Sequence, residues 1–203
     1  MEPTEIDMSE YGWVLYSDGN YRNAKNWFVD AVFEDSTYKD GYNGLGWTYG
    51  KLGEIDSSIT NFHRGRTRAF QDTTNEDWNL LLSDPPHDVA KETTAGLALA
   101  YHAKNNHKRA IIYGNYLLSM TGDTSYAAPG SPNWTLSRDP TKLDATHIIW
   151  TMASSYYAQG NFGNSLAHIQ QLISDPASFI PDSTTAEGWW ELSEKIEFLR
   201  GNL

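Results

Sequence analysis

Apolar residues recur along the chain at helical intervals, in stretches separated by short polar turns. Such spacing is typical of amphipathic helices that bury one face. Four of the turns begin with Gly or Asn followed by a polar residue, and each lies between two such stretches. These turns are Gly19-Asn20-Tyr21, Gly53-Glu54-Ile55, Asn105-Asn106-His107 and Gly160-Asn161-Phe162. The pattern therefore predicts an all-α protein built from helix pairs.

Small residues flank every turn at the same two distances. One lies seven residues before the first turn residue, and another lies five residues after it. The pairs are Gly12 and Ala24, Gly46 and Ser58, Ala98 and Ala110, and Ala153 and Ser165. Because small side chains let two helices approach closely, this spacing predicts how the helices of each pair pack.

The first two turns are 34 residues apart, which is the period of the tetratricopeptide repeat. Leu45-Gly46-x2-Tyr49 matches the first half of that family's motif, and Ala24-x3-Phe28 matches the second half. The third and fourth copies match in part, through Leu97-Ala98-x2-Tyr101 and Met152-Ala153-x2-Tyr156. The chain therefore resembles the tetratricopeptide repeat (TPR) family, with degenerate repeats that lack the motif's tryptophan.

The resemblance implies a single TPR-like α-solenoid domain over residues 1–203, with about four helix pairs and a C-terminal capping helix. The predicted repeats cover about 5–38, 39–72, 91–124 and 146–179. The capping helix is predicted at about 184–200, where Ser183-Thr184-Thr185-Ala186-Glu187 supplies a capping box. One apolar stripe of this helix consists of Trp189, Leu192, Ile196 and Leu199. It should cover the face that the last repeat would otherwise expose.

Two inserts lengthen the later repeats, because the next turns are 52 and 55 residues apart. The first insert covers about 73–90, where 76–82 is interpreted as an extended second helix or one extra helical turn ended by prolines. The second covers about 121–141 and is rich in Gly, Pro, Ser and Asp. We expect this loop to fold back toward the groove or a repeat end, because Tyr126 and Trp134 gain little by pointing into water.

In a solenoid of this kind the first helix of each pair lines a concave surface on which partners bind. The motif therefore predicts an aromatic groove that anchors an extended ligand. The predicted groove residues are Trp13, Tyr16, Asn43, Trp47, His102, His147, Trp150 and Tyr157. The same tryptophans could instead pack between the repeats. Truncation of a core tryptophan costs about 3 to 5 kcal/mol of stability, whereas truncation of an exposed one costs under about 1 kcal/mol.

One subclass of the family grips the terminal carboxylate of chaperone tails with Lys, Asn and Arg at the groove positions. The corresponding positions here hold Ser9, Trp13, Asn43, Ala95 and Leu99. Only Asn43 keeps a matching residue type. We therefore expect no carboxylate clamp.

Charge and composition exclude several classes of function. The formal net charge is -11, from 15 Lys+Arg against 26 Asp+Glu. This balance opposes binding to nucleic acids or to anionic membranes, since both need a basic surface. The absence of cysteine excludes disulfides, thiolate metal sites and cysteine nucleophiles. The longest apolar runs are far shorter than the roughly 20 residues that a membrane span requires.

No motif in the chain points to catalysis. The six histidines form no short metal-binding spacing, and neither a phosphate-binding loop nor a nucleophile elbow occurs. The acidic run 72–77 lacks the glycine and the distal Glu of a calcium loop. We therefore expect no enzyme, no cofactor and no metal site.

Three functional hypotheses remain open. The leading one is a non-enzymatic scaffold that binds a protein or peptide in the aromatic groove. The second is a structural or assembly module that acts through the repeat ends or the convex face, with the groove filled internally by the inserted loop. The third is a carbohydrate or small-molecule binding protein, because tryptophan also stacks on sugars.

The compartment also stays open. Residues 1–5 have neither the basic residues nor the apolar run of an export signal, and a signal removed earlier would not be visible. The composition, without cysteine and low in lysine, resembles repeat domains of bacterial periplasmic or outer-membrane lipoproteins after signal removal. A cytoplasmic location is the alternative.

Overall fold

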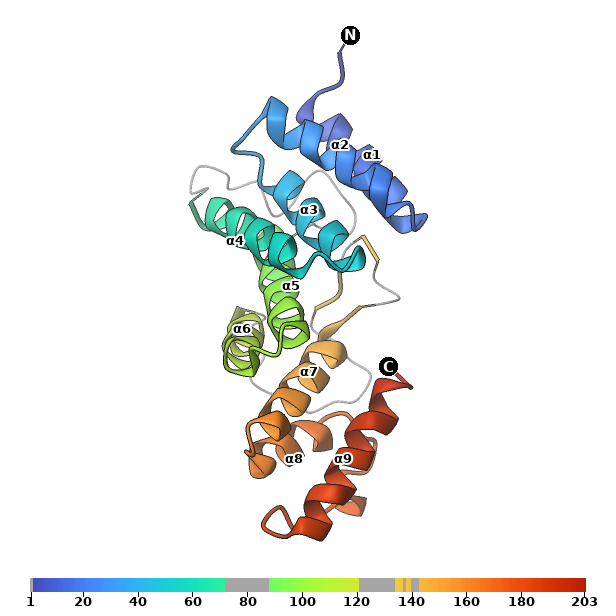
Figure 1. The fold of residues 1–203 in the computed structure, drawn as a ribbon, viewed down its shortest axis with the longest axis vertical. Helices are drawn as coiled ribbons and strands as arrows, with labels where there is room; N and C mark the ends of the chain where they lie inside the picture. The colour runs from blue at the N-terminus through green and yellow to red at the C-terminus, as the bar shows by residue number, and fades with distance from the viewer. Residues whose placement is uncertain (1, 72–87, 121–133, 137, 140–142) are drawn as a thin grey trace. The chain divides into compact units, whose positions relative to one another are not determined.

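The computed structural model describes residues 2–71, 88–120, 134–136, 138–139 and 143–203. These residues are all-α, apart from one isolated bridge between Thr135 and Asp144 among them (Figure 1). The α-helices are α1 (Glu5–Ser17), α2 (Tyr21–Glu34), α3 (Lys39–Lys51), α4 (Ile55–Gln71), α5 (Val89–Ala103), α6 (His107–Met120), α7 (Ala145–Ala158), α8 (Phe162–Gln170) and α9 (Ala186–Arg200). A short 3-10 helix, η1 (Pro176–Ser178), follows α8. The predicted fold class, consecutive helix pairs followed by a last helix, is confirmed.

The four predicted turns end the first helix of each pair in the same way. Their first residues have a positive φ, from 72° to 78° for the three glycines and 59° for Asn105. The N–H of the next residue donates to the carbonyl five residues earlier, as Asn20 does to Leu15 at 2.8 Å and Glu54 to Tyr49 at 2.9 Å. This left-handed turn satisfies carbonyls at the helix end and reverses the chain.

In the pairs α1–α2, α3–α4 and α7–α8, the small residues on either side of the turn are buried where the two helices pack together. A Cβ on Gly46 would lie 2.3 Å from the ring of Phe62, so only glycine lets that ring reach the helix backbone. Ser58 Oγ donates to the Gly46 carbonyl at 2.7 Å, and Ser165 Oγ donates to the Ala153 carbonyl at 2.8 Å. The predicted packing rule is therefore confirmed for these three pairs, and in two of them it includes a hydrogen bond. For Ala98 and Ala110 it stays a prediction.

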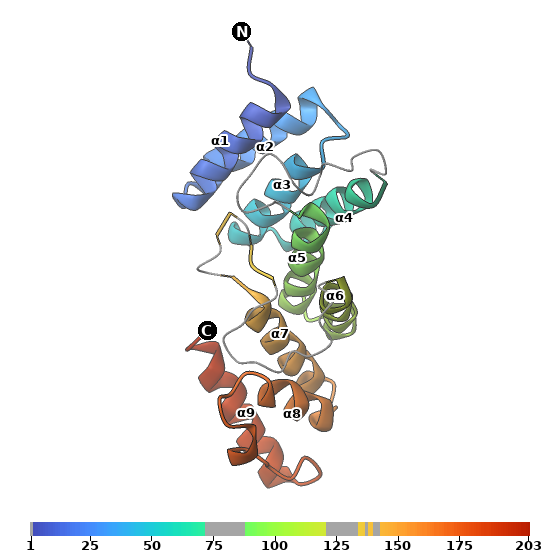
Figure 2. The same cartoon turned by 180° about the vertical axis from the view of Figure 1, so that it is seen from behind.

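The chain divides into two compact units. Unit 1 comprises Met1–Ala100 together with Leu136–Asp139, and unit 2 comprises Tyr101–Thr135 together with Pro140–Leu203. In unit 1 the pair α1 and α2 packs against α3, which pairs with α4, and the two opposite views show this stacking (Figures 1 and 2). In unit 2 α6 packs on α7, which pairs with α8, and α9 contacts both α7 and α8. The single-domain assignment over 1–203 stays a prediction.

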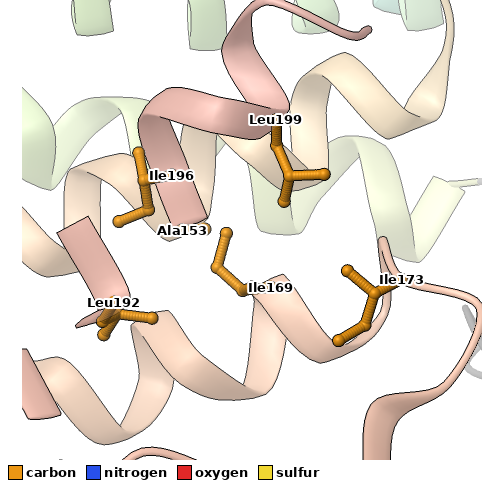
Figure 3. Close-up of a cluster of buried hydrophobic side chains, with 6 residues drawn as sticks. All are labelled: Ala153, Ile169, Ile173, Leu192, Ile196 and Leu199. Carbon is orange, nitrogen blue, oxygen red and sulfur yellow. The ribbon is translucent and has the colours of Figure 1, made fainter. Parts of the chain in front are cut away.

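The apolar core of unit 2 lies where α9 covers α7 and α8. The buried side chains that point toward one another are Ala153, Ile169, Ile173, Leu192, Ile196 and Leu199 (Figure 3). The helix begins after Thr185, whose Oγ1 accepts from the Gly188 N–H at 3.2 Å. The predicted capping box is wrong in its second half, because the third helical residue is Gly188 and has no side chain to return the bond.

The inserts are described only in part. The predicted helical segment 76–82, the acidic run 72–77 and Tyr126 lie outside the described residues. Trp134 is buried, and the N–H of Ala145 donates to its carbonyl at 2.9 Å. Leu136 is only 1% exposed and belongs to unit 1. The described part of the 121–141 loop therefore packs back on the helices, as expected.

Candidate functional site

A buried hydrogen-bond network joins the first helices of unit 1, on the face where the groove was predicted. Its centre is the carboxylate of Asp40 in α3, which is buried. Oδ2 of Asp40 accepts from Ser9 Oγ and from Trp13 Nε1, both in α1, at 2.9 Å each. Asn43 Nδ2 donates to the other oxygen, Oδ1, at 3.3 Å. We call the surface formed by α1, α3 and the N-terminal half of α5 in unit 1 the first-helix face.

Asn43 extends this network to the next first helix. Its Nδ2 donates to Glu92 Oε2 of α5 at 2.7 Å, and its Oδ1 accepts from Trp47 Nε1 at 3.1 Å. Asn43 and Glu92 are both almost completely buried. Because buried polar groups are costly without partners, these bonds hold the three first helices in register.

The predicted groove residues of unit 1 are not exposed. Trp13 is 2% exposed and Trp47 is 7% exposed, and Tyr16 and Asn43 are buried as well. The expectation that these four side chains face an open groove is therefore wrong. Each indole lies edge-on to the phenylalanine of the second helix of its own pair, Phe28 or Phe62, with ring centroids 5.1 Å apart in both. Their role as ligand contacts stays a prediction.

The predicted groove residues of unit 2 are covered by helix α9 or bonded within the unit. Trp150 Nε1 donates to the Ile196 carbonyl at 2.9 Å, and Tyr157 Oη donates to the Trp189 carbonyl at 3.2 Å. His102 Nδ1 lies 2.9 Å from Ser155 Oγ. His147 Nδ1 lies 3.0 Å from Asp144 Oδ1, at the start of α7. The four side chains thus form structural contacts, and their role in ligand binding stays a prediction.

The first-helix face of unit 1 holds a segment of the chain from far away in the sequence. We call Leu136, Arg138 and Asp139 the inserted segment. The Arg138 guanidinium binds the Glu10 carboxylate with both terminal nitrogens, and the Nη1–Oε2 distance is 3.0 Å. Ser17 Oγ donates to the Arg138 carbonyl at 3.4 Å, and the guanidinium carbon lies 5.8 Å from the centroid of the Trp13 ring. An arginine is thus bound on the surface of α1.

The electrostatics of the face favour a cation at this place. Burial lowers the pKa of Arg138, but the hydrogen bond to Glu10 and the charges of Asp40, Glu10 and Glu92 outweigh it, so the net shift is upward. Burial also raises the pKa of Tyr38, and the Asp40 carboxylate raises it further. Tyr38 therefore stays a neutral phenol, and the carboxylates are the groups that attract the guanidinium.

Sequence reasoning missed Glu10, Asp40, Glu92 and Arg138. A signal existed for two of them, since Asp40 and Glu92 each lie thirteen residues before the first residue of their turns, Gly53 and Asn105. Acidic residues at one repeat position in two consecutive repeats indicate a shared role on one face. Arg138 had no such signal, because it lies in an insert and binds a residue 128 positions away.

The described ranges contain neither a cluster of metal-binding side chains nor a helix able to span a membrane. No group of three His, Cys, Asp or Glu side chains in the described ranges is arranged to hold a metal ion. Among the helices with described residues, none combines the length and the apolar character needed to cross a membrane.

Comparison with known proteins gives a likeness among solved structures. No family model and no curated protein matches the chain. Among solved structures, the chain is similar to a tetratricopeptide repeat protein from Parabacteroides merdae, with 11% sequence identity and a TM-score of 0.38. The alignment covers 97% of this chain and 72% of that one.

Proposed function

We propose that the chain is a non-enzymatic scaffold of degenerate tetratricopeptide repeats that binds an extended segment of a partner protein on the first-helix face of unit 1. The motif residues and the four equivalent turns support the family assignment. The first-helix face contacts the inserted segment through hydrogen bonds, an ion pair and an aromatic ring. Contacts of these kinds are suited to binding a segment of a partner protein. The proposal requires no cofactor, nucleic acid or membrane.

The observation that carries the proposal is the inserted segment itself. Leu136 is buried, and Arg138 bonds to Glu10 and Ser17 of α1. The inserted segment, which is not helical, is thus bound by side chains of the first-helix face. Solenoids commonly bind partners in extended conformation on this side. The predicted residue Trp13 remains part of the site, because its ring lies beside the bound guanidinium.

The experiment that tests this proposal adds the inserted segment as a separate peptide. A labelled peptide with the sequence of residues 134–144 is titrated against a full-length chain carrying Leu136→Ser and Arg138→Gln, which weaken the internal contact. Fluorescence anisotropy should show saturable binding. Circular dichroism confirms that the variant chain is folded.

The control introduces Glu10→Arg into the same variant, which places a positive charge where the guanidinium binds. Binding should then fall by about tenfold or more, since like charges at a contact are unfavourable. A folded Leu136→Ser/Arg138→Gln chain that does not bind the peptide, or binds a scrambled peptide equally well, would contradict the proposed function.

An assembly module is the second candidate, and helix α9 favours it. Trp190 is 62% exposed, and Phe198 lies eight residues later and is also exposed. Exposed aromatic side chains on one helix face are typical of contacts between proteins. Light scattering of the wild type and of a Trp190→Ser/Phe198→Ser variant distinguishes this function, because only an assembly module loses an oligomer in the variant.

Carbohydrate binding, the third hypothesis, depends on exposed indoles. Trp13 and Trp47 are buried and bonded to protein side chains through Nε1. These two residues therefore offer no platform for a sugar in this structure.

A further inference from the structure

The contacts of Arg138 indicate the chemistry of the partner. The residues of α1 that touch it are Glu10, Trp13 and Ser17, spaced by three and four positions, so they form one stripe along the helix. The buried carboxylate of Asp40 accepts from Trp13 of this stripe, and Asn43 connects it to the buried carboxylate of Glu92. The first-helix face therefore presents a carboxylate, an indole and a hydroxyl in a row, with further negative charge beneath.

We propose that this face recognises an arginine in an extended segment of a partner protein, and that Arg138 occupies the arginine position until the partner displaces it. The inference rests on the proposed function and deepens it, because it names the partner's anchoring residue. It also gives the inserted segment a regulatory role. The segment competes with the partner for the same side chains of α1.

Geometry explains why arginine fits better than lysine. Both terminal nitrogens of Arg138 bind the two oxygens of Glu10, which a planar guanidinium can do and a single ammonium group cannot. The guanidinium also lies beside the Trp13 ring, and arginine interacts favourably with aromatic faces. A lysine at the same place would keep the charge and lose the paired hydrogen bonds.

The internal contact is built so that it can be displaced. Glu10 is 51% exposed at its side chain, so solvent screens its ion pair with Arg138. Within the described part of the chain, Arg138 Nε is buried and has no hydrogen-bond partner. A buried donor without a partner weakens the bound state. A partner's arginine whose N–H donors all find acceptors would bind this face more tightly than Arg138 does. It would therefore displace Arg138.

The experiment compares three peptides on one protein. Labelled peptides with the sequence of residues 134–144, carrying Arg, Arg138→Lys or Arg138→Gln, are titrated against the full-length Arg138→Gln chain. The arginine peptide should bind about tenfold more tightly than the glutamine peptide, which corresponds to about 1.4 kcal/mol. The lysine peptide should lie between them. Wild-type protein should bind the arginine peptide about tenfold more weakly than the Arg138→Gln chain, because its own arginine competes.

The control is Arg200→Gln, which removes an exposed arginine of α9 that pairs with Glu197. This variant should bind the arginine peptide as weakly as the wild type. If circular dichroism shows that the Arg138→Gln chain is unfolded, the series is measured on the Arg138→Lys chain, where the same ranking is expected. Equal affinity for the three peptides would overturn the arginine inference and leave the proposed function standing. Absence of binding by all three would overturn both.

Discussion

The indole of Trp13 donates through Nε1 to Asp40 Oδ2 at 2.9 Å, and this bond connects the first helices of two adjacent repeats. Ser9 Oγ donates to the same oxygen from one turn earlier in α1. Trp13 was predicted to face a ligand in an open groove, and it instead links two repeats. The first-helix face of unit 1 is a closed surface on which the inserted segment lies.

Truncation of Trp13 should therefore destabilise the protein. We expect Trp13→Ala to lower the free energy of unfolding by about 3 to 5 kcal/mol, because a buried aromatic ring is removed. Urea unfolding followed by circular dichroism measures this change. A loss below about 1 kcal/mol would show that the indole is exposed in solution.

Trp13→Phe separates the hydrogen bond from the packing. It keeps an aromatic ring against Phe28 and removes the Nε1 donor to Asp40. We expect a loss of about 1 to 3 kcal/mol, since a buried carboxylate loses one of its donors. Equal stability of Trp13→Phe and the wild type would mean that the bond contributes nothing.

Gly46 should not tolerate a methyl group. A Cβ there would lie 2.3 Å from the Phe62 ring, so Gly46→Ala forces the two helices apart and should cost about 1 to 3 kcal/mol. Gly163, in the first turn of α8, has no atom within 4 Å of its Cβ position. The matched variant Gly163→Ala should stabilise the protein by about 0.5 kcal/mol. Similar melting temperatures for the two variants would refute the close approach at Gly46.

The helix pairs could be predicted from sequence because their determinants are local. A left-handed residue at each turn and small residues at two fixed distances are visible without any tertiary information, as at Gly53, Gly46 and Ser58. The exposure of Trp13 could not be predicted in the same way. It depends on Asp40 in the next repeat and on Arg138 from an insert. Long-range contacts of this kind leave no periodic signal.

Helix α9 should contribute stability through one face only. Leu192 is completely buried against α7 and α8, and Leu192→Ala should cost about 2 to 5 kcal/mol. Trp190, two residues earlier, is not part of that core cluster and is mostly exposed. Trp190→Ala should change stability by less than about 0.5 kcal/mol. Thermal unfolding of both variants tests this, and equal destabilisation would show that α9 packs differently.

Stability should fall on mild acidification because of two half-buried imidazoles, those of His102 and His168. Burial lowers the pKa of His102 below its ordinary value of 6.5, and the positive charges of His107 and Arg200 lower it further. Burial also lowers the pKa of His168, against a hydrogen bond to the Asn164 carbonyl that raises it in part. Below pH 6.5 these histidines bind more protons in the unfolded chain than in the folded chain. Acid therefore favours unfolding.

The free energy of unfolding should therefore be unaffected by these groups above pH 6.5 and should decrease as the pH falls below 6.5. In His102→Gln this decrease should be smaller, and in His102→Gln/His168→Gln smaller again. Urea unfolding at a series of pH values gives the slopes. Identical slopes in the wild type and the double variant would contradict the assignment.

Hydrogen exchange at the Trp13 indole tests the closed face most directly. Proton–nitrogen NMR of the full-length chain follows the exchange of Nε1–H with solvent. The account predicts slow exchange in the wild type, and exchange about tenfold faster or more in the Arg138→Gln chain, where local opening of the face is easier. Exchange in the wild type as fast as in an unfolded peptide, or equal rates in the two proteins, would show that the inserted segment does not close this face.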